Sequence, residues 1–329
     1  MLILAAMAVG AVIPAQTAVN SRLRTSVGAP LPTSFYSFTV AFLCAVSLAV
    51  ATSGVRWDFA AAAAEPWWVW IGGVMGTVFL TGNVVLFPRL GSVETVVIPI
   101  LGQVIMALVI DQFGLFGSPQ TEISALRLLG AVVVFAGILC IHVLRRSNTG
   151  AHADGGLLWG WRAFGVFMGM CSATQTAANG YLGTVLGSSI QAGAVNLAVG
   201  ATLLLLLSLS VRTSRQALLS SIESGPWWMW LGGVFGAIFV VGMATLAPII
   251  GTGATVIGQL AGTIICGQII ERFGFFGSPQ TPLHANRVLG LILVFLGAVL
   301  VRALTPLTHN RLNGLRQLEY RRIIHGQSA

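Results

Sequence analysis

Lysine is absent from this chain, and charged residues of every kind are scarce. Only 8% of the 329 residues are charged and 56% are hydrophobic, against roughly 25% charged residues in a soluble domain. So few charges cannot cover the surface of a water-soluble protein of this length. The composition therefore predicts an integral membrane protein whose solvent is lipid.

The net charge of +8 comes entirely from arginine. The arginines are dispersed among short connections between apolar runs and in the polar segment 305–329. A nucleic-acid interface gathers its basic residues on one face, whereas dispersed charge of this kind suits anionic lipid headgroups. We expect the lipid bilayer as a partner and no nucleic acid.

The chain also lacks a cluster of metal ligands or catalytic groups. Its four cysteines fall inside apolar runs without paired metal-ligand spacing, so we expect small apolar fillers rather than disulfides or a metal site. The five histidines are scattered at helix ends and in loops, and no serine–histidine–acid set can be inferred. The sequence predicts no metal, no cofactor and no enzyme.

Long apolar runs dominate the rest of the sequence. A membrane-spanning helix needs about 20 mostly apolar residues, and the alternating pattern of a membrane barrel is absent. The first run lacks a basic segment before it and ends in polar residues, so we expect a retained helix rather than a signal peptide. Ten candidate membrane helices are predicted, at 2–20, 33–53, 67–87, 92–110, 128–144, 163–180, 190–211, 227–247, 250–270 and 288–304.

An internal repeat is the strongest signal in the sequence. Residues 66–91 and 226–251 are identical at 13 of 26 positions, at a constant offset of 160. The same offset relates FGLFGSPQT at 113–121 to FGFFGSPQT at 273–281. QTAVN at 16–20 matches QTAAN at an offset of 159. These matches indicate a gene that duplicated and fused.

Each copy carries five predicted helices, so two sequential copies must enter the membrane in opposite orientations. We therefore predict an all-α integral membrane protein of ten transmembrane helices, arranged as two inverted five-helix repeats in one monomer. This architecture is typical of secondary transporters, whose solute site lies where the halves meet. The predicted boundaries are 1–146 for the first repeat, 147–162 for a linker, 163–304 for the second repeat and 305–329 for a polar tail.

The arginines give conflicting signals about orientation. The positive-inside rule places the central segment 145–162 in the cytoplasm and the N-terminus outside. The basic tail 305–329 would then lie outside, against the same rule. Because the predicted helices end at 110 and begin again at 128, Arg127 is assigned to the connection between them. Asp111 and Glu271, beside the repeated FG turns, are expected to be interfacial anchors or helix caps.

Several segments resemble the YdcZ family of bacterial inner-membrane proteins, within the drug/metabolite transporter superfamily. The resemblance extends over both halves, to about residue 304, and implies a fused two-unit, multi-pass inner-membrane protein that exports small molecules. The matching segments are QTAVNSRL (16–23), PWWVWIGGVMG (66–76), LGQ (101–103), DQFGLFG (111–117) and RLLG (127–130).

Four amide side chains repeat between the halves. Gln16 and Asn20 are spaced i, i+4 and so project from one helix face, and Gln175 and Asn179 repeat that pair. Amides in hydrocarbon need partners, so they should face the protein interior or a water-filled cavity. They could line a solute site, or they could lock the bundle by hydrogen bonds between helices.

Gln103 and Gln259 are the next candidates for a solute-binding site, since an amide both donates and accepts hydrogen bonds. They break the repeat, because Gln103 aligns with Thr263 and Gln259 lies one helical turn earlier. Glu94 is the acidic residue expected within a membrane helix. It could couple transport to a proton gradient, or it could be an interfacial glutamate paired with Arg89.

Repeated tryptophans and glycines follow Pro66 and Pro226. Indole rings favour the headgroup boundary, so an interfacial belt is expected, with an aromatic cage around a solute as the alternative. The glycines have the small-xxx-small spacing that lets membrane helices pack closely.

Together these features predict a secondary transporter of a small polar or amphipathic metabolite or drug, working by alternating access. Its candidate solute-binding residues are Gln16, Asn20, Gln103, Gln175, Asn179 and Gln259. The alternatives are a passive channel or a membrane scaffold subunit, and less favoured, a membrane-embedded lipid enzyme.

Overall fold

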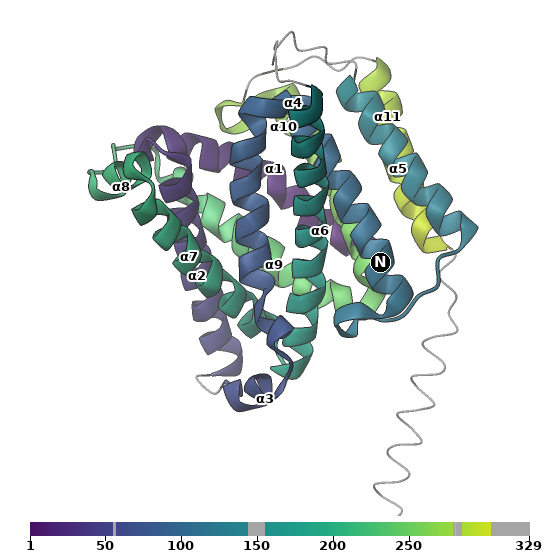
Figure 1. Cartoon of the computed structure of the whole chain (residues 1–329), viewed down its shortest axis with the longest axis horizontal. Coiled ribbons are helices and arrows are strands. Elements are labelled where there is room, and N and C mark those ends of the chain that lie inside the picture. Colours follow the sequence, from purple (N-terminus) through teal and green to yellow (C-terminus); the bar gives the residue numbers. More distant parts are fainter. Residues whose placement is uncertain (55–56, 144–154, 279, 281–284, 304–329) are drawn as a thin grey trace, which may run out of the picture.

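A computed structural model describes residues 1–54, 57–143, 155–278, 280 and 285–303, and all regular structure in these ranges is helical. Figure 1 gives the arrangement. The helices are α1 (Leu2–Val27), α2 (Pro30–Ser53), α3 (Phe59–Ala64), α4 (Gly72–Phe113), α5 (Ala125–Val143), α6 (Gly155–Val185), α7 (Ser189–Ser210), α8 (Arg212–Leu219), α9 (Leu231–Ile250), α10 (Thr252–Phe273) and α11 (Ala285–Ala303). Short 3₁₀ turns are η1 (Trp67–Trp70), η2 (Leu115–Gly117), η3 (Trp227–Trp230) and η4 (Phe275–Gly277).

The all-helical membrane class predicted from composition is confirmed. Among the described residues, six helical segments are long and apolar enough to cross a membrane, and two shorter apolar segments lie in α5 and α11. The predicted stretches follow helices with small differences: 67–87 and 227–247 begin in η1 and η3, 190–211 ends one residue beyond α7, and 250–270 crosses Gly251 between α9 and α10. Residues 144 and 304 lie outside the described ranges. The arrangement of these helices as ten spans in two inverted repeats stays a prediction.

Helix α4 combines two stretches that the sequence separates, 67–87 and 92–110. A methyl group on Gly165 of α6 would lie 3.3 Å from Leu86 and 2.9 Å from Ile98. Twelve residues of straight helix span about 18 Å, so α4 must double back between these two side chains. In Figure 1 its ribbon bends over near the label. The helical path is continuous, but it forms two arms that both pack on α6.

Equivalent helices of the two repeats also meet each other. A methyl group on Gly137 of α5 would lie 2.7 Å from the carbonyl oxygen of Gly290 on α11. One on Gly297 would lie 2.7 Å from the carbonyl oxygen of Gly130. Later residues of α5 therefore contact earlier residues of α11, so the two helices are antiparallel. Small residues bring the two backbones close together.

Glycines also allow close approaches between the halves at two further helix pairs, α1 with α10 and α4 with α6. A methyl group on Gly262 of α10 would overlap the carbonyl group of Met7 on α1, and one on Gly102 of α4 would overlap the carbonyl group of Val166 on α6. The largest apolar core fills the space between these helices, α5 and α11, and includes Ile110, Ile138, Ile257 and Val294. The first helix of each repeat thus packs on the other repeat.

We expect Gly262→Ala to lower the stability of the protein, because its new methyl group meets backbone rather than a movable side chain. Overpacking of this kind costs about 1–3 kcal/mol. Gly160→Ala is the matched control, since a methyl group at this exposed helical position meets nothing within 4 Å. Thermal unfolding in detergent measures both. Equal unfolding temperatures for the two variants would contradict the close approach of α1 and α10.

Candidate functional site

The second repeat's amide pair lies where α6 meets the beginning of α4. A methyl group on Gly72 would overlap the side-chain oxygen of Asn179, and one on Gly76 would lie 2.8 Å from the amide of Gln175. Gln175 Nε2 also donates to Asn196 Oδ1 on α7 over 3.4 Å. The repeated amide motif of one half therefore packs directly on the repeated glycine motif of the other.

The first repeat's amide pair makes the equivalent contact at α9. A methyl group on Gly232 would overlap Asn20 Oδ1, and one on Gly236 would lie 2.9 Å from Gln16 Nε2. Asn20 Oδ1 is buried and accepts no hydrogen bond within the structure. The four predicted amides thus form two clusters, each at a different junction between the halves, rather than one group.

Gln103 and Gln259 are both 6% exposed. Gln259 Nε2 donates to Thr263 Oγ1 over 3.1 Å, and Thr263 donates to the carbonyl oxygen of Gly10 over 2.9 Å. Gln259 therefore belongs to a chain of hydrogen bonds that ties α10 to α1. Gln103 lies on the second arm of α4, where its backbone nitrogen is 2.8 Å from the position of a methyl group on Gly169 of α6.

The side chain of Glu94 lies outside the described residues, although its backbone belongs to α4. Its expected partner Arg89 donates to the carbonyl oxygen of Val85 over 2.7 Å. The guanidinium carbon of Arg89 also lies 4.1 Å from the ring centroid of Trp161. Both interpretations of Glu94, proton coupling and interfacial pairing, stay predictions.

A buried ion pair joins α4 to α5. Arg127 Nη2 lies 2.6 Å from Asp111 Oδ2, and the two side chains are 2% and 0% exposed. Asp111 Oδ2 also accepts a hydrogen bond of 3.0 Å from the backbone N–H of Gly253, in the first turn of α10. Arg127 Nη1 donates to the carbonyl oxygen of Thr121 over 3.0 Å. The carboxylate is therefore held by donors from both halves.

This geometry corrects the assignment of Arg127 to a connection. It lies in the first turn of α5 and is buried because a carboxylate 16 residues earlier neutralises it. The expected role of Asp111 as a cap agrees with its contact at Gly253, but the capped helix is α10 of the other half. A helix N-terminus favours a negative charge through its free N–H groups and its dipole.

The repeated FG motif forms a tight turn beside this ion pair. Phe116 has φ 55° and its counterpart Phe276 has φ 57°, a left-handed conformation that is sterically unfavourable for a bulky residue. Ser118, at the end of the turn, shares a hydrogen bond of 3.0 Å with the hydroxyl of Thr252 on α10. Strained backbone that is retained at equivalent places in both repeats suggests a functional role.

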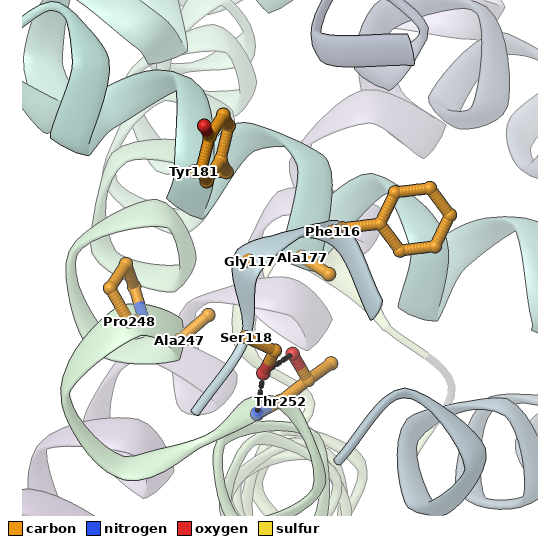
Figure 2. Close-up of a pocket in the computed structure, with 8 residues that line it drawn as sticks. All are labelled: Phe116, Gly117, Ser118, Ala177, Tyr181, Ala247, Pro248 and Thr252. Carbon is orange, nitrogen blue, oxygen red and sulfur yellow. Dashed lines mark hydrogen bonds between the residues drawn. The ribbon is translucent and has the colours of Figure 1, made fainter. Parts of the chain in front are cut away.

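A small cavity lies beside this turn (Figure 2). The FG turn of the first half forms one side of it, and α6, α9 and α10 of the second half form the other. Figure 2 shows the Ser118 and Thr252 hydroxyls facing each other at this cavity. None of the six predicted solute-binding residues lines it. Its walls include Phe116, Ser118, Ala177, Tyr181, Pro248 and Thr252.

Aromatic rings surround the same turn. The ring centroid of Trp68 lies 5.3 Å from that of Phe116 and 4.9 Å from that of Tyr181. The Tyr181 hydroxyl donates to Glu65 Oε2 over 2.9 Å. Trp67 is 77% exposed, as an interfacial belt requires, but Trp68 packs inward. Sequence reasoning missed this cluster, although the near identity of the FG motif in both repeats marked one of its members.

Comparisons with known proteins support a membrane transporter. A family model described as "Putative inner membrane exporter, YdcZ" matches residues 1–140 and again 160–300. No protein of curated function matches the sequence. A solved structure described only as "Crystal structure of protein" has a TM-score of 0.63 at 15% sequence identity, and the match covers 91% of this chain and 97% of that one. At this identity the likeness shows a common fold alone.

Breaking the buried ion pair on one side should destabilise the protein strongly. Asp111→Asn or Arg127→Met leaves one uncompensated buried charge, which costs about 3–5 kcal/mol. The double variant should recover part of that loss, because neither charge remains. Unfolding in detergent measures the coupling between the two sites, with the exposed Glu122→Gln as control. If the double variant loses as much free energy of unfolding as the two single variants together, a direct interaction between Asp111 and Arg127 is contradicted.

Proposed function

This chain belongs to the YdcZ family of inner-membrane exporters, and we propose that it is a secondary transporter that works by alternating access. The family match supports transport in general and a multi-pass position in the inner membrane. The substrate we propose is a small polar or amphipathic metabolite or drug. The chain has no nucleotide-binding motif, so transport would be driven by an ion gradient or by the gradient of the solute.

The proposed architecture is ten transmembrane helices in two inverted five-helix repeats. Support comes from the antiparallel course of the equivalent helices α5 and α11, since equivalent helices run in opposite directions when a repeat is inverted. The equivalent contacts of α1 with α10 and of α6 with α4 also support it. In such an inverted arrangement, the interface between the two repeats presents equivalent residues towards the two sides of the membrane.

The observation that carries the proposal is the pair of amide clusters between the halves. In each cluster an amide motif from one half meets a glycine motif from the other. Among the described residues, the buried atoms Asn20 Oδ1 and Asn196 Nδ2 have no hydrogen-bond partner. An unsatisfied buried polar group costs about 1–3 kcal/mol. A polar solute that passes between the halves would satisfy such groups, whereas a purely structural seam would have no use for them.

Glycines at the same junctions bring the helices close together. A methyl group on Gly73 would lie 2.6 Å from the carbonyl oxygen of Asn196, and one on Gly233 would lie 2.7 Å from that of Ser37. A valine side chain of the neighbouring helix packs into each glycine position, Val199 at Gly73 and Val40 at Gly233. We propose that the halves rock about these two junctions and expose the amides to each side of the membrane in turn.

Counterflow in liposomes tests the proposal. Purified protein should exchange at least one labelled solute from a panel of amino acids, sugars, nucleosides and organic cations, and the exchange should saturate. Gln103→Ala and Gln175→Ala should each lower this exchange by about tenfold, as for a lost hydrogen bond of roughly 1.4 kcal/mol. Gln216→Ala, on the exposed face of α8, should leave it unchanged.

Exchange that does not saturate would favour a passive channel. A complete lack of flux across the panel would favour a scaffold subunit. Unchanged exchange in both Gln103→Ala and Gln175→Ala, with folded protein, would reject the amides as a solute-binding site while leaving transport itself intact.

A further inference from the structure

The aromatic cluster at one end of the bundle carries a negative charge. We propose that Trp68, Phe116, Tyr181 and Glu65, here called the aromatic mouth, bind the cationic head of the solute, a quaternary or protonated amine. This inference rests on the proposed transport function and names its substrate class. The mouth is formed by Glu65 at the end of α3, by η1, by η2 and by the end of α6, and none of its residues belongs to the amide clusters.

The rings of the mouth are arranged for a cation. Trp68 contacts both other rings, at centroid distances of 5.3 and 4.9 Å, and its ring plane is tilted by 74° and 47° from theirs. All three residues are partly exposed, so ring surface is accessible. An organic cation within about 6 Å of a tryptophan or tyrosine face is attracted by the negative potential of the ring. Aromatic walls of this kind recognise quaternary ammonium groups.

Glu65 supplies the charge that selects a cation over a neutral molecule. Its carboxylate accepts the Tyr181 hydroxyl over 2.9 Å, which fixes it at the rim of the rings. Among the described residues no ion pair of Glu65 is found. The nearby buried pair of Asp111 and Arg127 carries no net charge. Glu65 therefore places a negative charge at the rim of the mouth.

A small cavity lies beside the mouth, and Phe116 and Tyr181 line it. In this conformation its enclosed space is far smaller than that of pockets for drug-sized ligands, which measure roughly 300–1,000 Å³. The cationic head therefore binds on the exposed ring surfaces of the mouth rather than inside this cavity. The strained φ of Phe116 holds its ring at this position, next to Trp68.

The equivalent position in the other repeat lacks the carboxylate of Glu65. The aromatic pair is kept there, with 5.9 Å between the centroids of Trp228 and Phe276. Arg22 occupies the place of Tyr181, and Gly225 occupies the place of Glu65. A methyl group on Gly225 would lie 3.4 Å from Arg22 Nη2, so a guanidinium lies near the place that the carboxylate has in the first mouth. We therefore expect this second mouth to bind a cation less well.

Binding of a cation and its neutral isostere to the full chain in nanodiscs tests the inference. The probes are radiolabelled choline and unlabelled 3,3-dimethyl-1-butanol, which replaces the ammonium nitrogen with carbon. Choline should bind saturably, and the neutral alcohol should not displace it. Glu65→Gln and Trp68→Leu should each weaken choline binding by about tenfold. Tyr181→Phe keeps the ring and loses the hydrogen bond to Glu65, so its effect should be smaller.

Matched variants at the second mouth serve as controls. Trp228→Leu removes the tryptophan equivalent to Trp68 and should leave choline binding unchanged, as should Glu122→Gln at an exposed carboxylate. Displacement by the neutral alcohol at equal concentration, or full binding in Glu65→Gln, would overturn the inference. So would the absence of choline binding in a protein that exchanges other solutes, a result that leaves the proposed function standing. Choline binding without exchange of any solute would instead reject transport and keep the cation site.

Discussion

A polar group inside a bundle that is surrounded by lipid has no water to bond with, and this constraint organises the whole fold. Each amide motif packs on a glycine motif of the other half, and Gln175 also donates to Asn196 of its own half. Asn179 meets Gly72 and Asn20 meets Gly232, in both cases at a glycine that admits no side chain. Neither half could bury its own amides in this way, so the two copies depend on each other for their interiors.

The same dependence governs the charged residues. Asp111 and Arg127 can both lie in the interior because the carboxylate also meets the free N–H of Gly253 at the beginning of α10. The helix terminus and the arginine together replace the water that the carboxylate has lost. The FG turn between the two charged residues brings them together, and Ser118 ties that turn to Thr252. A single turn thus fixes an ion pair, a helix cap and one wall of a cavity.

Much of the helical architecture could be predicted from sequence, because a span needs an apolar run of fixed length and the duplication marks equivalent runs. The contacts between runs could not. Nothing in QTAAN indicates that its partner is the glycine motif 100 residues earlier, since that pairing depends on how helices are arranged in space. Arg127 was misassigned because its charge suggests a loop, and only the position of Asp111 explains its burial. The two apolar runs 67–87 and 92–110 predict a change of direction between them, but not the continuous helical path of α4 through that bend.

The contrast between Tyr181 and Arg22 has an evolutionary meaning. Two identical subunits that lie in opposite orientations in a membrane present the same residues to both sides of it. The reason is that any mutation in the gene appears in both subunits. Fusion into one chain removes that restriction, and each copy can then mutate alone. In the proposed inverted arrangement, replacing one tyrosine–glutamate pair by arginine and glycine makes the two faces of the protein chemically different. Two identical subunits in the same arrangement would have identical faces, so a difference of this kind needs the fused chain.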